Sequence, residues 1–352
     1  MREKLQFLSL LILILGVIAI GVSYYVTNVA QAPLESPGGE EGPVEVVFVV
    51  EPGQSTAEIA EHLARERLIS SAFAFQWYAR LRGMDGRLEA GRYTLRSDMT
   101  MDQILETLTS APGPVEINIT IPEGMRLEEV AELLDEKGIF AAADFRAALQ
   151  ETYDYDFLAD RPEGASLEGY LFPDTYRIFS SDPPTRFVAL MLENFGTRFD
   201  AAMREQARAE GKTIFEVVTL ASIVEKEAIR DEERPLIASV YLNRLAAGMT
   251  LDADPTVQYA VGYNARQGRW WPELYFDELK IDRLSDIDSP YNTYRYPGLP
   301  PGPICSPGLA ALRAVLEPAD TDYYYFVAKG DGSHAFARTL EEHNANVARY
   351  QR

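Results

Sequence analysis

Two glutamates at the end of an apolar segment are the residues best suited to chemistry. Residues 214–228 read Ile-Phe-Glu-Val-Val-Thr-Leu-Ala-Ser-Ile-Val-Glu-Lys-Glu-Ala, which predicts a largely buried, central helix. Glu225 and Glu227 lie at its C-terminal end, where the helix dipole disfavours an anion and apolar neighbours remove water. Both effects raise the pKa of a carboxyl group, so a glutamate here can hold the proton that general acid catalysis requires near neutral pH.

The spacing does not decide which of the two glutamates is catalytic. Residues two apart on a helix point in directions about 200° apart, so the pair cannot act from one face. Glu225 continues the apolar stripe and is expected to be the more buried, whereas Glu227 lies at the edge of the stripe, where a substrate could reach it. A solvated helix end without a catalytic role is the alternative to both.

The composition limits the classes of function. The formal net charge of -21 comes without a basic patch, which argues against nucleic acid as a partner and favours a sugar polymer or a neutral or cationic partner. Cys305 is the single cysteine, so an intrachain disulfide scaffold is excluded. The three histidines form no cluster with metal-ligand spacing, and the sequence indicates no metal site.

An apolar run at the N-terminus predicts a membrane anchor. Residues 8–26 are apolar apart from two serines, which is close to the roughly 20 residues that a bilayer-spanning helix needs. Arg2 and Lys4 precede the run, and positive charge favours the cytoplasmic side. We therefore expect residues 1–27 to form a cytoplasmic tip and a transmembrane helix of a single-pass protein of the cytoplasmic membrane, with the rest outside the cytoplasm. A cleaved signal peptide is the alternative, because Ala30-Gln31-Ala32 resembles a cleavage site.

The remaining sequence predicts a linker and two folded domains. Residues 28–43 are rich in Pro, Gly and Glu, as in a solvated linker. Residues 44–112 show a strand–helix–helix–strand pattern that resembles a LysM-like glycan-binding module, with a purely structural α+β subdomain as the alternative. Residues 113–352 are expected to form a mixed α+β catalytic domain around the central apolar helix. The predicted fold class is therefore α+β.

Short sequence blocks follow one another in a defined order along the chain. One of them reads Ala221-Ser222-Ile223-Val224-Glu225-Lys226-Glu227. The complete series covers residues 168–176, 221–227, 238–245, 248–249, 254–257, 289–294, 298–304, 325–328, 332–336 and 343–344. Each block alone has modest specificity for a family. The ordered set resembles the endolytic murein transglycosylase family (MltG, YceG-like) over most of the chain from residue 44.

The resemblance implies a lytic reaction on peptidoglycan. The family cleaves the β-1,4 bond between N-acetylmuramic acid and N-acetylglucosamine without adding water and leaves 1,6-anhydro ends, with no metal or cofactor. The aligned catalytic residue is Glu227, and Glu225 is the second candidate. Ala228 stands where related lytic enzymes often carry Ser or Thr, which puts the choice between the two in doubt. Implied partners are glycan strands and peptidoglycan synthases (penicillin-binding proteins) at the membrane, where nascent strands would be terminated.

Several polar and aromatic side chains are candidates for binding the sugar. Aromatic rings and amides suit stacking on, and hydrogen bonding to, sugar rings, although buried loop packing would use the same residue types. The candidates, some from residue type and some from the resemblance alone, are Asn243, Arg244, Asp254, Thr256, Tyr291, Asn292, Thr293 and Tyr294. Two other functions stay open: a peptidoglycan-binding scaffold without turnover, and a hydrolytic muramidase that uses Asp254 as a second carboxylate.

Overall fold

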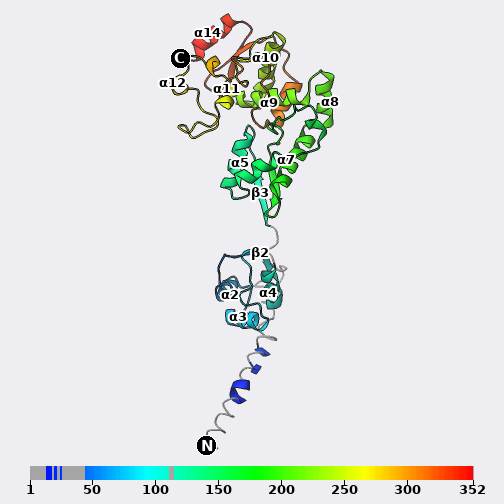
Figure 1. Cartoon of the computed structure of the whole chain (residues 1–352), viewed down its shortest axis with the longest axis vertical. Helices are drawn as coiled ribbons and strands as arrows, with labels where there is room; N and C mark the ends of the chain where they lie inside the picture. The colour runs from blue at the N-terminus through cyan, green and yellow to red at the C-terminus, as the bar shows by residue number, and fades with distance from the viewer. Residues whose placement is uncertain (1–12, 18–19, 22–23, 26–43, 111–114, 352) are drawn as a thin grey trace, which may run out of the picture. The chain divides into compact units, whose positions relative to one another are not determined.

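The computed structural model describes residues 13–17, 20–21, 24–25, 44–110 and 115–351 (Figure 1). The chain divides into two compact units, Met1–Val115 and Glu116–Arg352. Each unit has its own hydrophobic core.

Within residues 44–110, the smaller unit combines one strand pair with three helices. Strand β1 (Glu45–Val50) pairs antiparallel with β2 (Gly91–Arg96), and helices α2 (Thr56–Arg65) and α3 (Ala72–Leu81) lie between them in the chain. Helix α4 (Met101–Thr109) follows β2. The predicted order strand–helix–helix–strand is confirmed for these elements. A capping box starts α2, because Ser55 and Glu58 exchange side-chain and backbone hydrogen bonds.

The larger unit has two short antiparallel strand pairs. Strand β3 (Glu116–Thr120) pairs with β4 (Thr175–Phe179), and β5 (Tyr325–Ala328) pairs with β6 (His334–Ala337). Most of this unit is helical. Its helices and 3-10 turns, in chain order, are α5 (Leu127–Glu136), α6 (Ala142–Ala148), η1 (Asp156–Leu158), α7 (Pro184–Arg198), α8 (Ala201–Ala209), α9 (Ile214–Glu227), η2 (Asp231–Glu233), α10 (Arg234–Ala246), α11 (Asp254–Val261), α12 (Phe276–Leu279), η3 (Leu284–Asp286), α13 (Leu309–Leu316) and α14 (Leu340–Tyr350).

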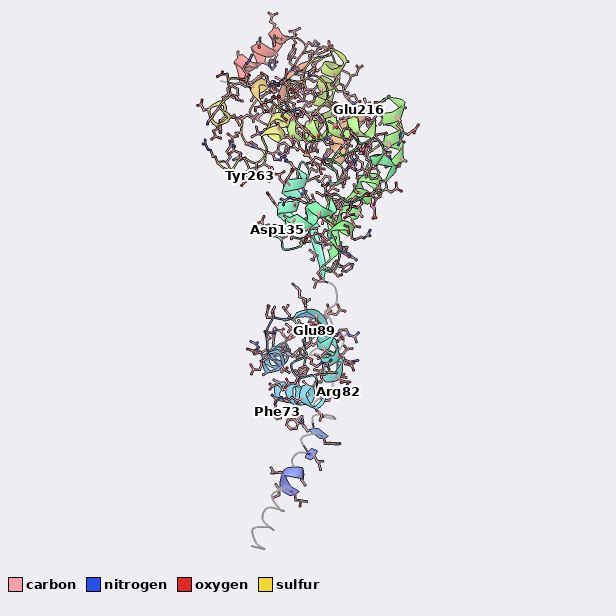
Figure 2. The ribbon with its side chains drawn as sticks, viewed as in Figure 1. Phe73, Arg82, Glu89, Asp135, Glu216 and Tyr263 are labelled. Atoms are coloured by element: carbon pink, nitrogen blue, oxygen red, sulfur yellow. The ribbon has the colours of Figure 1, made fainter. Side chains whose placement is uncertain are left out.

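Helix α9 is the central helix of the larger unit. Thr213 and Glu216 form a capping box at its start, and Figure 2 labels Glu216 there. Every residue from Val217 to Val224 is buried, since α8, α10, α11 and α13 all pack against this helix. The helix ends at Glu227, so burial gives way to partial exposure at the two glutamates.

The predicted transmembrane helix is corrected by the structure. A bilayer span needs about 20 consecutive apolar residues in a helix. Among the residues that the structure describes, no helix is long and apolar enough to cross a membrane. Much of the predicted span 8–26, and all of the predicted linker 28–43, lies outside the described residues. The fold class is accordingly mixed α and β, with no spanning helix among the described residues, and the localisation as a single-pass membrane protein is corrected with it.

Candidate active site

A cavity of about 420 Å³ opens at the C-terminal end of α9. Four predicted site residues line it: Glu227 from α9, Arg244 from α10, Asp254 from α11, and Tyr294 from the loop before α13. Strand β5 and helix α14 complete the wall. Segments far apart in the chain therefore meet around the end of one buried helix.

Glu227 contributes one of the carboxyl groups that line this cavity. Burial raises its pKa to about 7, and the negative charge of Asp254 adds to the rise. The hydrogen bond from Tyr241 and the positive charge of Arg244 act in the opposite direction. The Tyr241 hydroxyl donates to Glu227 Oε1 at 2.8 Å. Oε2 has no hydrogen-bond partner in the described part of the chain. A carboxyl group with a pKa near 7 can both give and take a proton at neutral pH.

Glu225 lies in different surroundings. Its Oε1 accepts from Arg234 Nη2 at 3.0 Å, and both side chains are only 7% exposed. Its Oε2 accepts from the backbone N–H of Gly308 at 3.1 Å. Both oxygens are thus engaged in tying α9 to the starts of α10 and α13, and Glu225 does not line the cavity.

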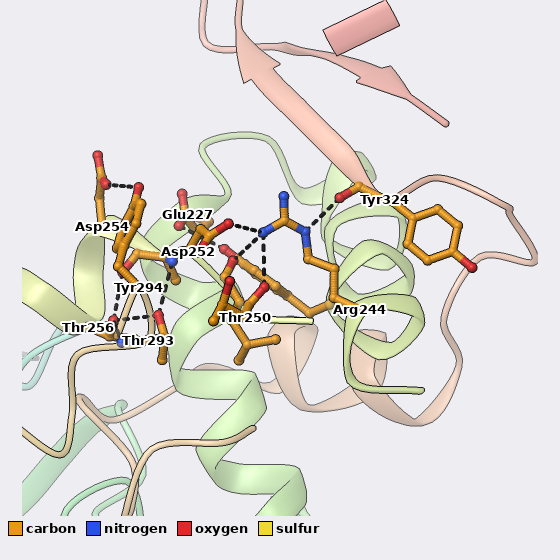
Figure 3. Close-up of polar contacts among 12 residues, drawn as sticks. Glu227, Arg244, Thr250, Asp252, Asp254, Thr256, Thr293, Tyr294 and Tyr324 are labelled. Atoms are coloured by element: carbon orange, nitrogen blue, oxygen red, sulfur yellow. Dashed lines mark hydrogen bonds and ion pairs between the residues drawn. The ribbon is translucent and has the colours of Figure 1, made fainter. Parts of the chain in front are cut away.

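The Arg244 guanidinium is held rigidly at the cavity wall (Figure 3). Nε donates to the Tyr324 carbonyl at 2.6 Å, and Nη1 donates to the carbonyls of Thr250 and Leu251 and to Asp252 Oδ2 at 3.2, 2.9 and 3.0 Å. Figure 3 shows the third nitrogen, Nη2, without a dashed contact. Arg244 therefore presents a fixed cation whose remaining donor has no partner among the described residues.

Asp254 and Tyr294 form a second polar pair in the cavity. The Tyr294 hydroxyl donates to Asp254 Oδ1 at 2.6 Å (Figure 3). Burial raises the pKa of this tyrosine beyond its usual range, and the neighbouring Asp254 carboxylate adds to the rise. Tyr294 consequently stays a hydrogen-bond donor throughout the neutral pH range.

Three other predicted residues lie behind the cavity and hold its loops. The hydroxyls of Thr256 and Thr293 are 2.8 Å apart, and both residues are buried (Figure 3). The buried Asn292 side chain donates to the carbonyls of Leu284 and Ile287 at 2.8 Å each. These contacts fix the segment that carries Tyr294 beside the start of α11.

The last two predicted residues also make internal contacts. Asn243 Nδ2 donates to the carbonyls of Thr321 and Tyr323 at 2.9 Å each and so holds the chain that leads into β5. Tyr291 packs against Tyr259, with ring centroids 4.7 Å apart. Neither lines the cavity.

Sequence reasoning missed other residues at this site. Tyr241 contacts the Glu227 carboxyl, while Asp252, Tyr325 and His343 line the cavity. One signal was available: Tyr241 precedes Arg244 by three positions, so the two share one face of α10. The wall from β5 and α14 had no local signal, because it meets α9 only in the tertiary structure.

Within the described ranges, no three His, Cys, Asp or Glu side chains are grouped so that they could hold a metal ion. Cys305 is fully buried, and its thiol contacts the Ser222 carbonyl at 3.3 Å.

Comparison with known proteins identifies the family. The model of the YceG-like family matches residues 48–349. The endolytic murein transglycosylase of Bacillus subtilis (strain 168) is 33% identical over 310 residues, which cover 85% of this chain and 82% of that protein. A protein of the same name from Streptococcus pneumoniae (strain D39) is 33% identical over 323 residues, and the match spans 85% of this chain but only 57% of that protein.

A solved structure agrees with these matches. The crystal structure of a YceG-like protein from Listeria monocytogenes superposes with a TM-score of 0.55 at 30% identity, covering 86% of this chain and 98% of that one. The resemblance inferred from the ordered sequence blocks is thereby confirmed. The chain belongs to the YceG-like family.

Proposed function

We propose that this chain cleaves peptidoglycan glycan strands as an endolytic lytic transglycosylase, with Glu227 as its single general acid and base. The predicted enzyme class is confirmed by the family match and by relatives named endolytic murein transglycosylase. The placement of Glu227 carries the assignment of the residue: it lines the cavity with a pKa raised to about 7, and no residue in the described ranges engages its Oε2.

The proposed reaction needs only one carboxyl group. Glu227 donates its proton to the oxygen of the β-1,4 bond between N-acetylmuramic acid and N-acetylglucosamine, and the bond from C1 to that oxygen breaks. The 6-hydroxyl of the same muramic acid then attacks C1 while Glu227 takes up the hydroxyl proton. The carboxyl group regains its proton, no water is added, and a 1,6-anhydro end results.

The other proposed site residues have two kinds of role. Arg244, Asp254 and Tyr294 share the cavity with Glu227 and are proposed to contact the sugar directly. Their donors and acceptors match the hydroxyl and N-acetyl groups of a glycan. For Asn243, Thr256, Tyr291, Asn292 and Thr293, the internal contacts favour an indirect role in holding the loops around the cavity.

The test is digestion of purified peptidoglycan with the full chain, followed by mass spectrometry of the ends. We expect new 1,6-anhydro ends from the wild-type chain and none from Glu227→Gln. The Glu225→Gln variant is the control and should still produce them where it is folded. Binding without new ends would favour the scaffold. Ends that carry ¹⁸O from labelled water would favour hydrolysis with Asp254 as the second carboxylate.

The smaller unit is proposed to bind glycan as a LysM-like module. The order β1, α2, α3, β2 supports this reading, as does the independent core of the unit. Co-sedimentation of the inactive Glu227→Gln chain with insoluble peptidoglycan, with and without residues 44–110, measures the contribution of the module. Unchanged binding would leave it a structural subdomain.

Peptidoglycan synthases of the penicillin-binding class are proposed as partners, because an enzyme that terminates strands must reach them as they are made. Capture of a purified synthase by the full chain tests this proposal. A lack of association at micromolar concentrations would count against it.

A further inference from the structure

We infer that Tyr241 is a positioning residue that confines the transferable proton of Glu227 to one oxygen, Oε2. The inference rests on the proposed role of Glu227. It adds the residue that decides which of the two Glu227 carboxyl oxygens carries the proton given to the substrate.

Tyr241 is held where its hydroxyl cannot swing away from Glu227. Its side chain lies on α10 and is 1% exposed. The ring packs edge-on against Phe326 of β5, with centroids 5.8 Å apart and an interplanar angle of 84°. A buried ring with this packing leaves the hydroxyl one position, 2.8 Å from Glu227 Oε1.

The direction of the hydrogen bond follows from what surrounds the hydroxyl. Within the described chain, Tyr241 has no other acceptor, so its proton points at Oε1. Burial raises the pKa of Tyr241 well above its ordinary value, and the adjacent Glu227 adds to the rise. The hydroxyl therefore keeps its proton, and donates it to Oε1, at every pH at which the protein would work.

An oxygen that already accepts the tyrosine proton is a poor place for a second proton. When Glu227 is neutral, its own proton consequently belongs on Oε2, the oxygen that no described residue engages. During the reaction Oε2 gives this proton to the glycosidic oxygen and later takes one from the 6-hydroxyl. The bond from Tyr241 to Oε1 is kept throughout, so one oxygen serves both half-reactions.

Other titratable or charged groups also face this carboxyl group. They come from α10, the loop after it, the start of α11, the loop before α13, β5, β6 and α14. These groups are Arg244, Asp252, Asp254, Tyr294, Tyr325, His334 and His343. A Tyr241→Phe variant leaves all seven in place, so a change in the titration of Glu227 in that variant reports the lost hydroxyl.

The experiment compares pH profiles of kcat/KM for the full-length chain on purified glycan strands. The hydrogen bond from Tyr241 stabilises ionised Glu227, and its loss should move the alkaline limb to higher pH. At the optimum, the rate should fall roughly tenfold to a hundredfold, the usual effect of losing a hydrogen bond to a charged group. A packing defect alone would lower the rate without moving the limb.

Tyr170→Phe is the matched control. Tyr170 is also fully buried in the core of this unit, but no described residue hydrogen-bonds to its hydroxyl. This variant should keep both the rate and the pH profile of the wild type. A folded Tyr241→Phe chain that behaves in the same way would overturn the inference, because it would reduce Tyr241 to a packing residue.

A second substitution covers the case in which Tyr241→Phe does not fold. Incorporation of 3-fluorotyrosine at position 241 keeps the ring and makes the hydroxyl a stronger donor, so the alkaline limb should move to lower pH. An unmoved limb would again contradict the inference. Failure of the proposed function is distinguishable, since it would show as anhydro ends formed by Glu227→Gln, whatever happens at position 241.

Discussion

Glu225 and Glu227 lie two residues apart on α9, yet their carboxyl groups have opposite surroundings. Glu225 is neutralised by Arg234 and by a backbone N–H, the arrangement of a structural ion pair. Glu227 is desolvated without a cationic partner in contact, which raises its pKa to about 7. At the scale of single residues, the site is therefore defined by which glutamate lacks a counter-charge rather than by which is more buried.

Substitution of Glu225 should affect stability rather than chemistry. Glu225→Gln removes the buried partner of Arg234 and leaves it only the exposed Asp231. The loss should cost about 1 to 3 kcal/mol, less than the roughly 3 to 5 kcal/mol of a buried charge left uncompensated. Urea unfolding of the variant should show this loss, while the folded protein still cuts glycan. The control is Glu193→Gln, which breaks an exposed pair with Arg186 and should cost less than about 1 kcal/mol. A stable but inactive Glu225→Gln chain would transfer the catalytic role to Glu225.

The pH dependence of cutting should follow the protonated form of Glu227. The donor must carry its proton when the glycosidic bond breaks, so activity should fall as pH rises through the pKa of about 7. Well above that value, kcat/KM should drop roughly tenfold per pH unit. Initial rates of anhydro-end formation between pH 5 and 9 measure this. A profile that stays flat to pH 9 would exclude Glu227 as the proton donor.

At the scale of elements, Gly169 lets its segment pack closely against both α9 and the loop before α13. Gly169 has φ +85°, a conformation that other residues rarely adopt. A Cβ at this position would lie 2.6 Å from Pro303 Cβ and 2.7 Å from Val218 Cγ1. The block 168–176 therefore packs against both elements only with glycine at this point.

Gly169→Ala should destabilise the larger unit and loosen the site. Backbone strain and overlap together should cost about 2 to 4 kcal/mol, seen as a lower urea midpoint. The matched control is Gly211→Ala. Gly211 has a similar φ of +73° but open space around it, so only the strain of about 1 kcal/mol applies. Equal losses in the two variants would show that the close approach to α9 contributes nothing.

At the scale of the whole molecule, burial of carboxyl groups links folding to pH. Glu168 is buried in the larger unit, and its Oε1 has no hydrogen-bond partner among the residues that the structure describes. Burial raises its pKa from the ordinary 4.5 to about 8, above that of Glu227. Between pH 4.5 and about pH 8, Glu168 of the folded chain keeps a proton that the unfolded chain has released. The free energy of unfolding therefore falls as pH rises through this range.

Glu168→Gln should remove part of this pH dependence. Wild-type stability should decline between about pH 5 and 8, whereas the variant should be more stable than the wild type at pH 9 by roughly 2 kcal/mol or more. The exposed Glu163 lies nearby in the chain, and Glu163→Gln, which also removes one negative charge, should follow the wild-type slope. Urea unfolding at several pH values measures the free energy of unfolding of all three chains. Parallel curves for Glu168→Gln and the wild type would refute the linkage.

Local patterns in the sequence were enough to determine several elements and the family. Helix α9 was predicted from its apolar run, β1 and β2 from their place in a strand–helix–helix–strand pattern, and the family from its ordered blocks. The transmembrane helix was the wrong prediction. An apolar run of spanning length predicts such a helix on hydropathy alone, and no described helix meets the requirement.

Only the tertiary structure separated the two glutamates and assembled the site. Periodicity indicates which face of a helix is buried, but it does not show which side chain meets that face. Arg234 reaches Glu225 from nine positions further along, Tyr241 reaches Glu227 from fourteen, and β5 and α14 close the cavity from about a hundred residues away. The pKa of a carboxyl group depends on such neighbours in space. The sequence alone determined where the acids lie along the helix, and the packing decided that Glu227 lines the cavity with a raised pKa.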